Sequence, residues 1–138
     1  MKKAILIVLF SILFIPQIAF AKDLSLLKVS FSDNINASCG ISAGFNPIKA
    51  CYLAGDDHIV IRSDIPLSYL PFVFFHEVGH FLMESMASSE YEALFQIAPE
   101  LTQNSNSFEY AADTFALWVL GAKVTPEQEK FFQKILTK

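Results

Sequence analysis

The clearest pattern along the chain is a long apolar run, LPFVFFHEVGHFLMESM, that starts at Leu70 and ends at Met86. The run is too long for a strand, and it carries no turn signal after Pro71. Proline is tolerated in the first turn of a helix, so Pro71 does not argue against one. Because apolar residues lie on nearly every side, the pattern predicts a buried helix over residues 70–86.

Three more helices are predicted after this run. A short one covers residues 90–97 and ends before Pro99. Another covers about 107–120, with Asn106 or Ser107 as its cap and Gly121 as its stop.

The last helix begins at Thr125, which caps it, and Pro126 takes the first helical position. Gln128 completes a capping box. The helix is amphipathic, and its apolar face consists of Phe131, Phe132, Ile135 and Leu136.

The region before the long helix alternates as strands do. Residues 26–32, LLKVSFS, predict a strand that ends at a turn-forming Asp-Asn pair, and residues 39–47 predict a loop. Two apolar runs, 48–54 and 58–63, flank a Gly-Asp-Asp turn and predict a β-hairpin whose second arm is an edge strand. We therefore expect an α+β fold with a small antiparallel sheet or hairpin packed on the buried helix.

The first 21 residues resemble a bacterial secretory signal peptide rather than part of the domain. Lys2 and Lys3 precede a short apolar run, and the segment closes with the small-residue pattern that ends at Ala21. The alternative is an uncleaved membrane anchor, but the run is shorter than the roughly 20 residues that a spanning helix needs. We expect cleavage after Ala21, a single domain over 22–138, and a secreted or periplasmic protein with no stable membrane span.

Net charge restricts the class of partner, and the two cysteines indicate a disulfide. The formal net charge of −4 becomes −6 without the two signal lysines, and an acidic domain without a basic cluster argues against nucleic acid as a partner. Export places Cys39 and Cys51 in an oxidising compartment, so we expect a disulfide between them. Two unpaired thiols are the alternative, and a zinc site built from them is disfavoured because no CxxC pair is present.

Residues 76–80, HEVGH, carry the candidate chemistry. On a helix, His76 and His80 share one face and can both reach one metal ion, while Glu77 can reach a water on the open side of that ion. This is where a general base is needed. The alternative is a pair of histidines satisfied only by backbone or carboxylate partners.

A catalytic zinc ion usually has a third protein ligand. His58 is the only remaining histidine, but Glu109 is the better candidate because Asp113 lies on the same helical face. Asp113 can then accept the free N–H of a ligand histidine. The alternative for Glu109 is an exposed charge near a helix N-terminus.

The combination of HEVGH and EYAAD resembles the HExxH…ExxAD signature of gluzincin-type zinc metallopeptidases, and is similar to that of the HtpX-like peptidases and small, minimal gluzincins. The resemblance covers about residues 54–121. It implies a zincin-like fold with one zinc ion (Zn2+), with His76, His80 and Glu109 as ligands, Glu77 as general base and Asp113 as support. HtpX-like peptidases carry transmembrane helices, which this chain lacks after its signal, so their substrates and localisation are not transferred.

The expected reaction is hydrolysis of a peptide bond in a peptide or protein substrate, bound as an added strand along the edge at residues 58–63. The group that would stabilise the oxyanion is left open among Tyr110, Tyr91, Tyr69 and His58. Gly79 costs helix stability and suggests close approach of a neighbouring element.

Two other functions stay open. The zinc site could stabilise a non-catalytic binding module, or the peptidase could be latent, with the helix at residues 125–138 covering the cleft. The oligomeric state is not predicted.

Overall fold

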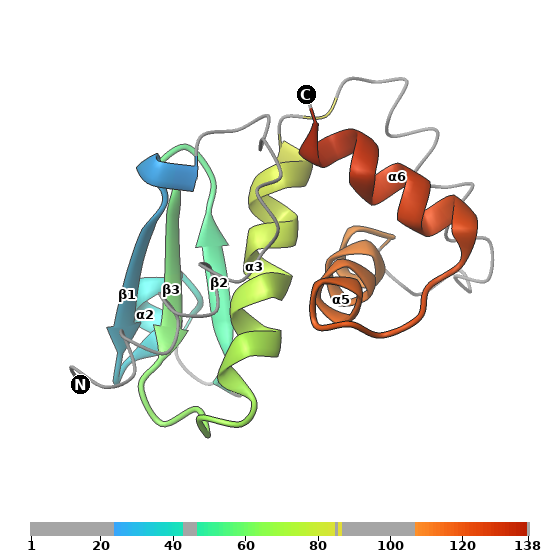
Figure 1. Ribbon diagram of the computed structural model, residues 1–138. Coiled ribbons are helices and arrows are strands. Elements are labelled where there is room, and N and C mark those ends of the chain that lie inside the picture. Colours follow the sequence, from blue (N-terminus) through green and yellow to red (C-terminus); the bar gives the residue numbers. More distant parts are fainter. Residues whose placement is uncertain (1–23, 43–46, 85, 87–106, 138) are drawn as a thin grey trace.

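The computed structural model describes residues 24–42, 47–84, 86 and 107–137 (Figure 1). Within this part of the chain, a small three-stranded sheet and several helices form a mixed α and β fold, in agreement with the predicted α+β class. The predicted signal peptide, the predicted helix over 90–97 and Tyr91 lie outside the described residues.

The sheet consists of β1 (Lys28–Ser32), β2 (Ala50–Leu53) and β3 (His58–Arg62), in the order β1-β3-β2. β2 and β3 form the predicted hairpin and pair antiparallel, with Cys51 opposite Val60. β1 pairs parallel with β3, so the predicted antiparallel sheet is wrong and the sheet is mixed.

β3 is the central strand, so the prediction that residues 58–63 form an edge strand is also wrong. Its three middle residues, Ile59, Val60 and Ile61, are all buried. An unbroken apolar run of this kind is typical of a strand covered on both faces. The edge next to the long helix therefore belongs to β2.

A short helix and a disulfide hold β2 in place. Helix α2 (Ile35–Ser38), which was not predicted, follows Asn34, whose side chain accepts the backbone N–H of Ala37. The C-cap residue of α2 is Cys39, and it forms the predicted disulfide with Cys51 of β2, with a Cα–Cα distance of 6.2 Å. The edge strand is thus tied to the segment that follows β1. A 3-10 turn, η1 (Leu24–Leu26), precedes β1.

Helix α3 (Leu70–Glu84) ends two residues before the predicted boundary and forms the centre of the fold. It lies between the sheet on one side and helices α5 and α6 on the other (Figure 1). Phe81 is fully buried and packs edge-to-face on Tyr52 of β2, at 5.7 Å between ring centroids. This two-sided burial explains why the α3 sequence is apolar almost all round. Despite its apolar character, neither α3 nor another helix among the described residues is long and apolar enough to cross a membrane.

Helices α5 (Ser107–Val119) and α6 (Pro126–Leu136) match their predicted extents closely. Gly121 follows α5 with φ +89°, and the N–H groups of Gly121 and Ala122 donate to Trp118 and Leu117, which is a Schellman motif. The predicted capping box at Thr125 and Gln128 is present. The apolar face of α6 packs on α5, where the rings of Phe132 and Phe115 are 5.6 Å apart.

Candidate metal centre and its groove

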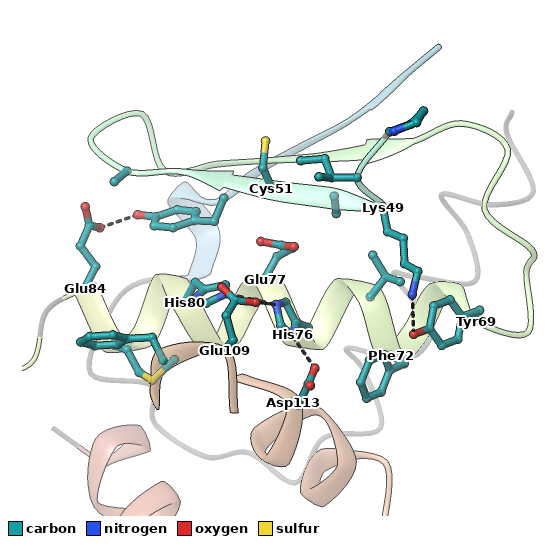
Figure 2. A pocket seen from close by; sticks show the side chains of 18 residues that line it. Lys49, Cys51, Tyr69, Phe72, His76, Glu77, His80, Glu84, Glu109 and Asp113 are labelled. Carbon is teal, nitrogen blue, oxygen red and sulfur yellow. Dashed lines mark hydrogen bonds and ion pairs between the residues drawn. The ribbon is translucent and has the colours of Figure 1, made fainter. Parts of the chain in front are cut away.

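Two helices bring the candidate ligands together. His76 and His80 lie one turn apart on α3, and Glu109 lies in the first turn of α5. One ligand atom from each lies within 4.8 Å of the other two, so the three residues could hold a metal ion. In Figure 2, the Glu109 carboxylate points at the two imidazoles across the space between the helices.

The separations fit a small tetrahedral ion. The Nε2 atoms of His76 and His80 are 3.1 Å apart, and the Glu109 oxygens lie 3.2 Å from Nε2 of His76 and 3.1 Å from Nε2 of His80. Ligand atoms at about 2.0–2.1 Å from a tetrahedral zinc ion would be about 3.3 Å from one another. Two nitrogens and one carboxylate are also a common donor set for zinc.

Asp113 orients one of the two imidazoles. His76 donates from Nδ1 to Oδ1 of Asp113 at 2.8 Å. A proton on Nδ1 leaves the lone pair of Nε2 directed at His80 and Glu109, which is the tautomer that a metal ligand requires. The structure thus places Asp113 beside His76, where the sequence analysis expected it.

Gly79 allows α5 to come close enough for these contacts. A Cβ atom on Gly79 would lie 3.1 Å from Cα of Ala112 and 3.3 Å from its Cβ. Ala112 lies between Glu109 and Asp113 in sequence and is fully buried. The expectation that Gly79 permits the approach of a neighbouring element is confirmed, and that element is the helix that carries Glu109.

In Figure 2, the Glu77 side chain projects from α3 toward the sheet and away from Glu109. Its residue is only 5% exposed, and its carboxylate accepts a hydrogen bond from the backbone N–H of Tyr52. Burial raises the pKa of the Glu77 carboxyl above its usual value, although the imidazoles of His76 and His80 lower it. A carboxylate with a raised pKa is a better proton acceptor near neutral pH.

Without a metal ion, the imidazoles and the Glu109 carboxylate stabilise one another's charged forms. Burial of His76 lowers the pKa of its imidazole, but the hydrogen bonds to Glu109 and Asp113 and the charge of Glu77 raise it more, so the net pKa lies above the usual value. Hydrogen bonds from His76 and then from His80 hold the pKa of the Glu109 carboxyl well below its usual range. The negative charge of Glu109 thus favours a protonated His76, and the hydrogen bonds from His76 and His80 favour an ionised Glu109.

The cluster opens into an elongated pocket of about 950 Å³ between the edge strand and helices α3 and α5, which we call the groove. The pocket extends along the whole of α3, from Tyr69, which precedes the helix, to Glu84 at its end. Glu77 and both histidines lie in its middle (Figure 2). The opposite wall is β2 with the residues just before it, from Pro47 to Tyr52, and Ala54 beyond it. Phe108, Glu109 and Asp113 of α5 complete the lining.

The hydrogen-bond register of the hairpin shows which backbone groups face this pocket. The N–H of Arg62 donates to the carbonyl of Lys49, so these two residues form a hydrogen-bonded pair. Such pairs alternate along an antiparallel ladder. The backbone groups of Ala50 and Tyr52 therefore point away from β3, in keeping with the bond from Tyr52 to Glu77.

The other residues considered as a ligand or as oxyanion donors differ in whether they line the pocket. His58 is hydrogen-bonded to Ser30 at 2.8 Å and does not line the pocket, so it is not part of the ligand cluster. Tyr110 faces α6, where its hydroxyl is 3.4 Å from Nε2 of Gln128. Among the described oxyanion candidates only Tyr69 lines the pocket. No residue of α6 lines it, so α6 does not cover the groove.

Sequence reasoning missed the residues that form the ends of the groove, namely Lys49, Tyr52 and Glu84. Their roles depend on β2 being the edge strand beside α3, and no local pattern distinguishes the two arms of the hairpin in that way.

Comparison with protein-family models, curated proteins and solved structures found no match to this chain. The function is therefore inferred from the residues of the site alone.

Proposed function

We propose that the protein is an exported zinc-dependent peptidase with a zincin-like active site. The observation that supports this most strongly is the convergence of His76, His80 and Glu109, with the buried carboxylate of Glu77 beside them in an open groove. The disulfide supports an oxidising compartment, where such bonds persist. Peptide hydrolysis is the reaction for which this set of groups is best suited.

Zinc held by the three ligands would polarise the carbonyl of a bound peptide and make a neighbouring water more acidic. Glu77 removes a proton from the attacking water and later donates it to the leaving amine. Burial and the Tyr52 backbone bond hold Glu77 in one position for both transfers. Asp113 keeps His76 in the tautomer that presents Nε2 to the ion.

The substrate path follows β2 instead of the predicted β3. Both sides of β3 are paired within the sheet, whereas β2 faces the groove with its outer edge. An extended peptide could add to this edge and form backbone hydrogen bonds with Ala50. Its carbonyl would then lie between the edge strand and α3, over Glu77 and the histidines.

A zinc-stabilised binding module is the second candidate, because the cluster links α3 to α5 and could contribute to folding. Two observations favour the peptidase. Structural zinc sites usually have four protein ligands, whereas the described cluster has three and opens to the groove. A structural site also has no need of Glu77, whose burial carries a desolvation cost.

The test is proteolysis by the purified, zinc-loaded protein. Denatured casein and a mixed peptide library are incubated with the wild type, with Glu77→Gln and with Glu127→Gln. Glu127 is an exposed residue in the first turn of α6, so the control makes the same chemical change far from the groove. Zinc content is measured for all three proteins.

We expect equal zinc content in the three proteins, cleavage by the wild type and Glu127→Gln, and a loss of at least about 100-fold in Glu77→Gln. If none of the zinc-loaded proteins cleaves any substrate, the peptidase proposal is wrong and the binding module is favoured. If Glu77→Gln cleaves as well as the wild type, Glu77 is not the base.

A further inference from the structure

The two ends of the groove carry opposite charges. At one end, Lys49 directs its Nζ atom to the hydroxyl of Tyr69, at 3.2 Å, and over the Tyr69 ring, at 4.8 Å from its centroid. At the other end, Glu84 accepts the hydroxyl of Tyr52. Figure 2 shows Lys49 and Tyr69 at one end of α3, Glu84 at the other, and the candidate metal ligands between them.

The acidic end is reinforced by the hairpin turn. The hydroxyl of Tyr52 also lies 3.1 Å from Oδ1 of Asp57, which is in the turn between β2 and β3. The carboxylates of Asp57 and Glu84 thus both contact the Tyr52 hydroxyl at this end. Lys49 is the one lysine or arginine among the described residues that line the pocket. The charge difference therefore runs along the groove, not across it.

The length of the groove matches a short peptide. α3 has 15 residues, which corresponds to about 22 Å along its axis. An extended strand rises about 3.3 Å per residue, so about seven residues would span this distance. Charged side chains roughly two to four residues from a central bond would reach the two ends.

The edge strand sets the direction. β2 runs from the Lys49 end of the groove toward the Glu84 end, as α3 does, because Lys49 contacts Tyr69 and Tyr52 contacts Glu84. Antiparallel pairing is slightly more stable per residue than parallel pairing. A peptide antiparallel to β2 has its N-terminal half at Glu84 and its C-terminal half at Lys49.

We propose that the groove selects peptides by the direction of their charge. It binds a peptide with a basic side chain N-terminal to the scissile bond, at Glu84, and with a carboxylate C-terminal to that bond, at Lys49. This inference rests on the proposed peptidase function and adds the substrate class to it. The carboxylate belongs to an acidic side chain or to the end of the peptide.

The test uses four quenched fluorescent peptides with one common central sequence, and the first three have blocked ends. One carries Lys on the N-terminal side and Glu on the C-terminal side, the second has these charges exchanged, and the third is neutral. A fourth has a free C-terminus in place of the Glu side chain and shows which carboxylate is bound. The proteins are the wild type, Lys49→Glu, Lys49→Glu combined with Glu84→Lys, and the control Lys130→Glu on the exposed side of α6.

Exposed ion pairs have modest effects, so we expect the wild type to prefer the first peptide over the second by about 4- to 25-fold in kcat/KM, from about two- to fivefold at each end. Lys49→Glu should lose the preference for a carboxylate, the double variant should invert the order, and Lys130→Glu should behave as the wild type. High salt should reduce the preference. Equal cleavage of the first two peptides, or a preference for the second, would overturn the inference.

Failure of this inference can be told apart from failure of the peptidase proposal. If the peptides are cleaved without preference, the peptidase stands and the charge selection is wrong. If no peptide is cleaved, the same four peptides, labelled with a single dye, are titrated into zinc-loaded Glu77→Gln protein and followed by fluorescence anisotropy. Tighter binding of the first peptide then supports the charge selection, and equal binding contradicts it.

Discussion

Asp113 offers a test of how α5 supports the candidate metal ligands. Asp113→Ala removes the acceptor for Nδ1 of His76 at 2.8 Å and leaves the ligand atoms in place. Without it, the imidazole is free to rotate and to take the other tautomer, which places a proton on Nε2. Loss of such a supporting carboxylate typically weakens metal binding by 10- to 100-fold, or about 1.4–2.7 kcal/mol.

The stability of the metal-free protein should change far less, because the Asp113 side chain is 53% exposed and an exposed pair contributes about 1 kcal/mol or less. The assay is competition for zinc with a chromophoric chelator, using the wild type, Asp113→Ala, Asp113→Asn and Glu127→Gln. Asp113→Asn keeps an oxygen acceptor and should lie between the wild type and Asp113→Ala. An unchanged zinc affinity in Asp113→Ala would refute the positioning role of this residue.

Three further predictions concern the fold around the site. Gly79→Val should destabilise the protein by about 1–3 kcal/mol in urea unfolding and weaken zinc binding, because even its Cβ meets the α5 backbone at 3.1 Å; unchanged stability would contradict the close helix contact. Cys39→Ser with Cys51→Ser should cost about 3 kcal/mol in the same assay, and a cost near zero would show that the bond does not restrain the edge strand. In the metal-free protein the pKa of His76 is raised, so the stability that His76 contributes to the folded state is lost as pH rises above about 6.5. The pKa of Glu109 is lowered, so the stability that Glu109 contributes is lost as pH falls below about 4.5. The stability difference between the wild type and Glu109→Gln, measured in a chelator, should therefore be largest between these values, and a difference independent of pH would contradict the pairing.

Helices α3, α5 and α6 were predictable because their signals are local. The apolar run gave α3 to within two residues, and the cap at Thr125 and the stop at Gly121 gave the limits of α6 and α5. The four-residue spacing of His76 and His80 places them on one face of any helix. Their convergence with Glu109 was predictable only from the resemblance and the face shared with Asp113, since no local rule brings α5 against α3.

The sheet was predicted less well because its pairing is non-local. Nothing in residues 28–32 indicates that this strand pairs parallel with 58–62, and this pairing makes β3 central and leaves β2 beside α3. The apolar run at Ile59, Val60 and Ile61 was a signal for a central strand that the hairpin pattern overrode. Helix α2 was missed because four residues are too few for a periodic pattern, although Asn34 was an available cap.

We have proposed that His76 and His80 of α3 and Glu109 of α5 bind a single zinc ion. The most direct measurement is the zinc content of the purified protein, by native mass spectrometry, for the wild type, Glu109→Ala and Glu127→Ala. We predict one zinc ion per chain in the wild type and in Glu127→Ala, and its loss in Glu109→Ala under the same conditions. Full zinc occupancy in Glu109→Ala, or no zinc in the wild type after zinc loading, would contradict the proposed site.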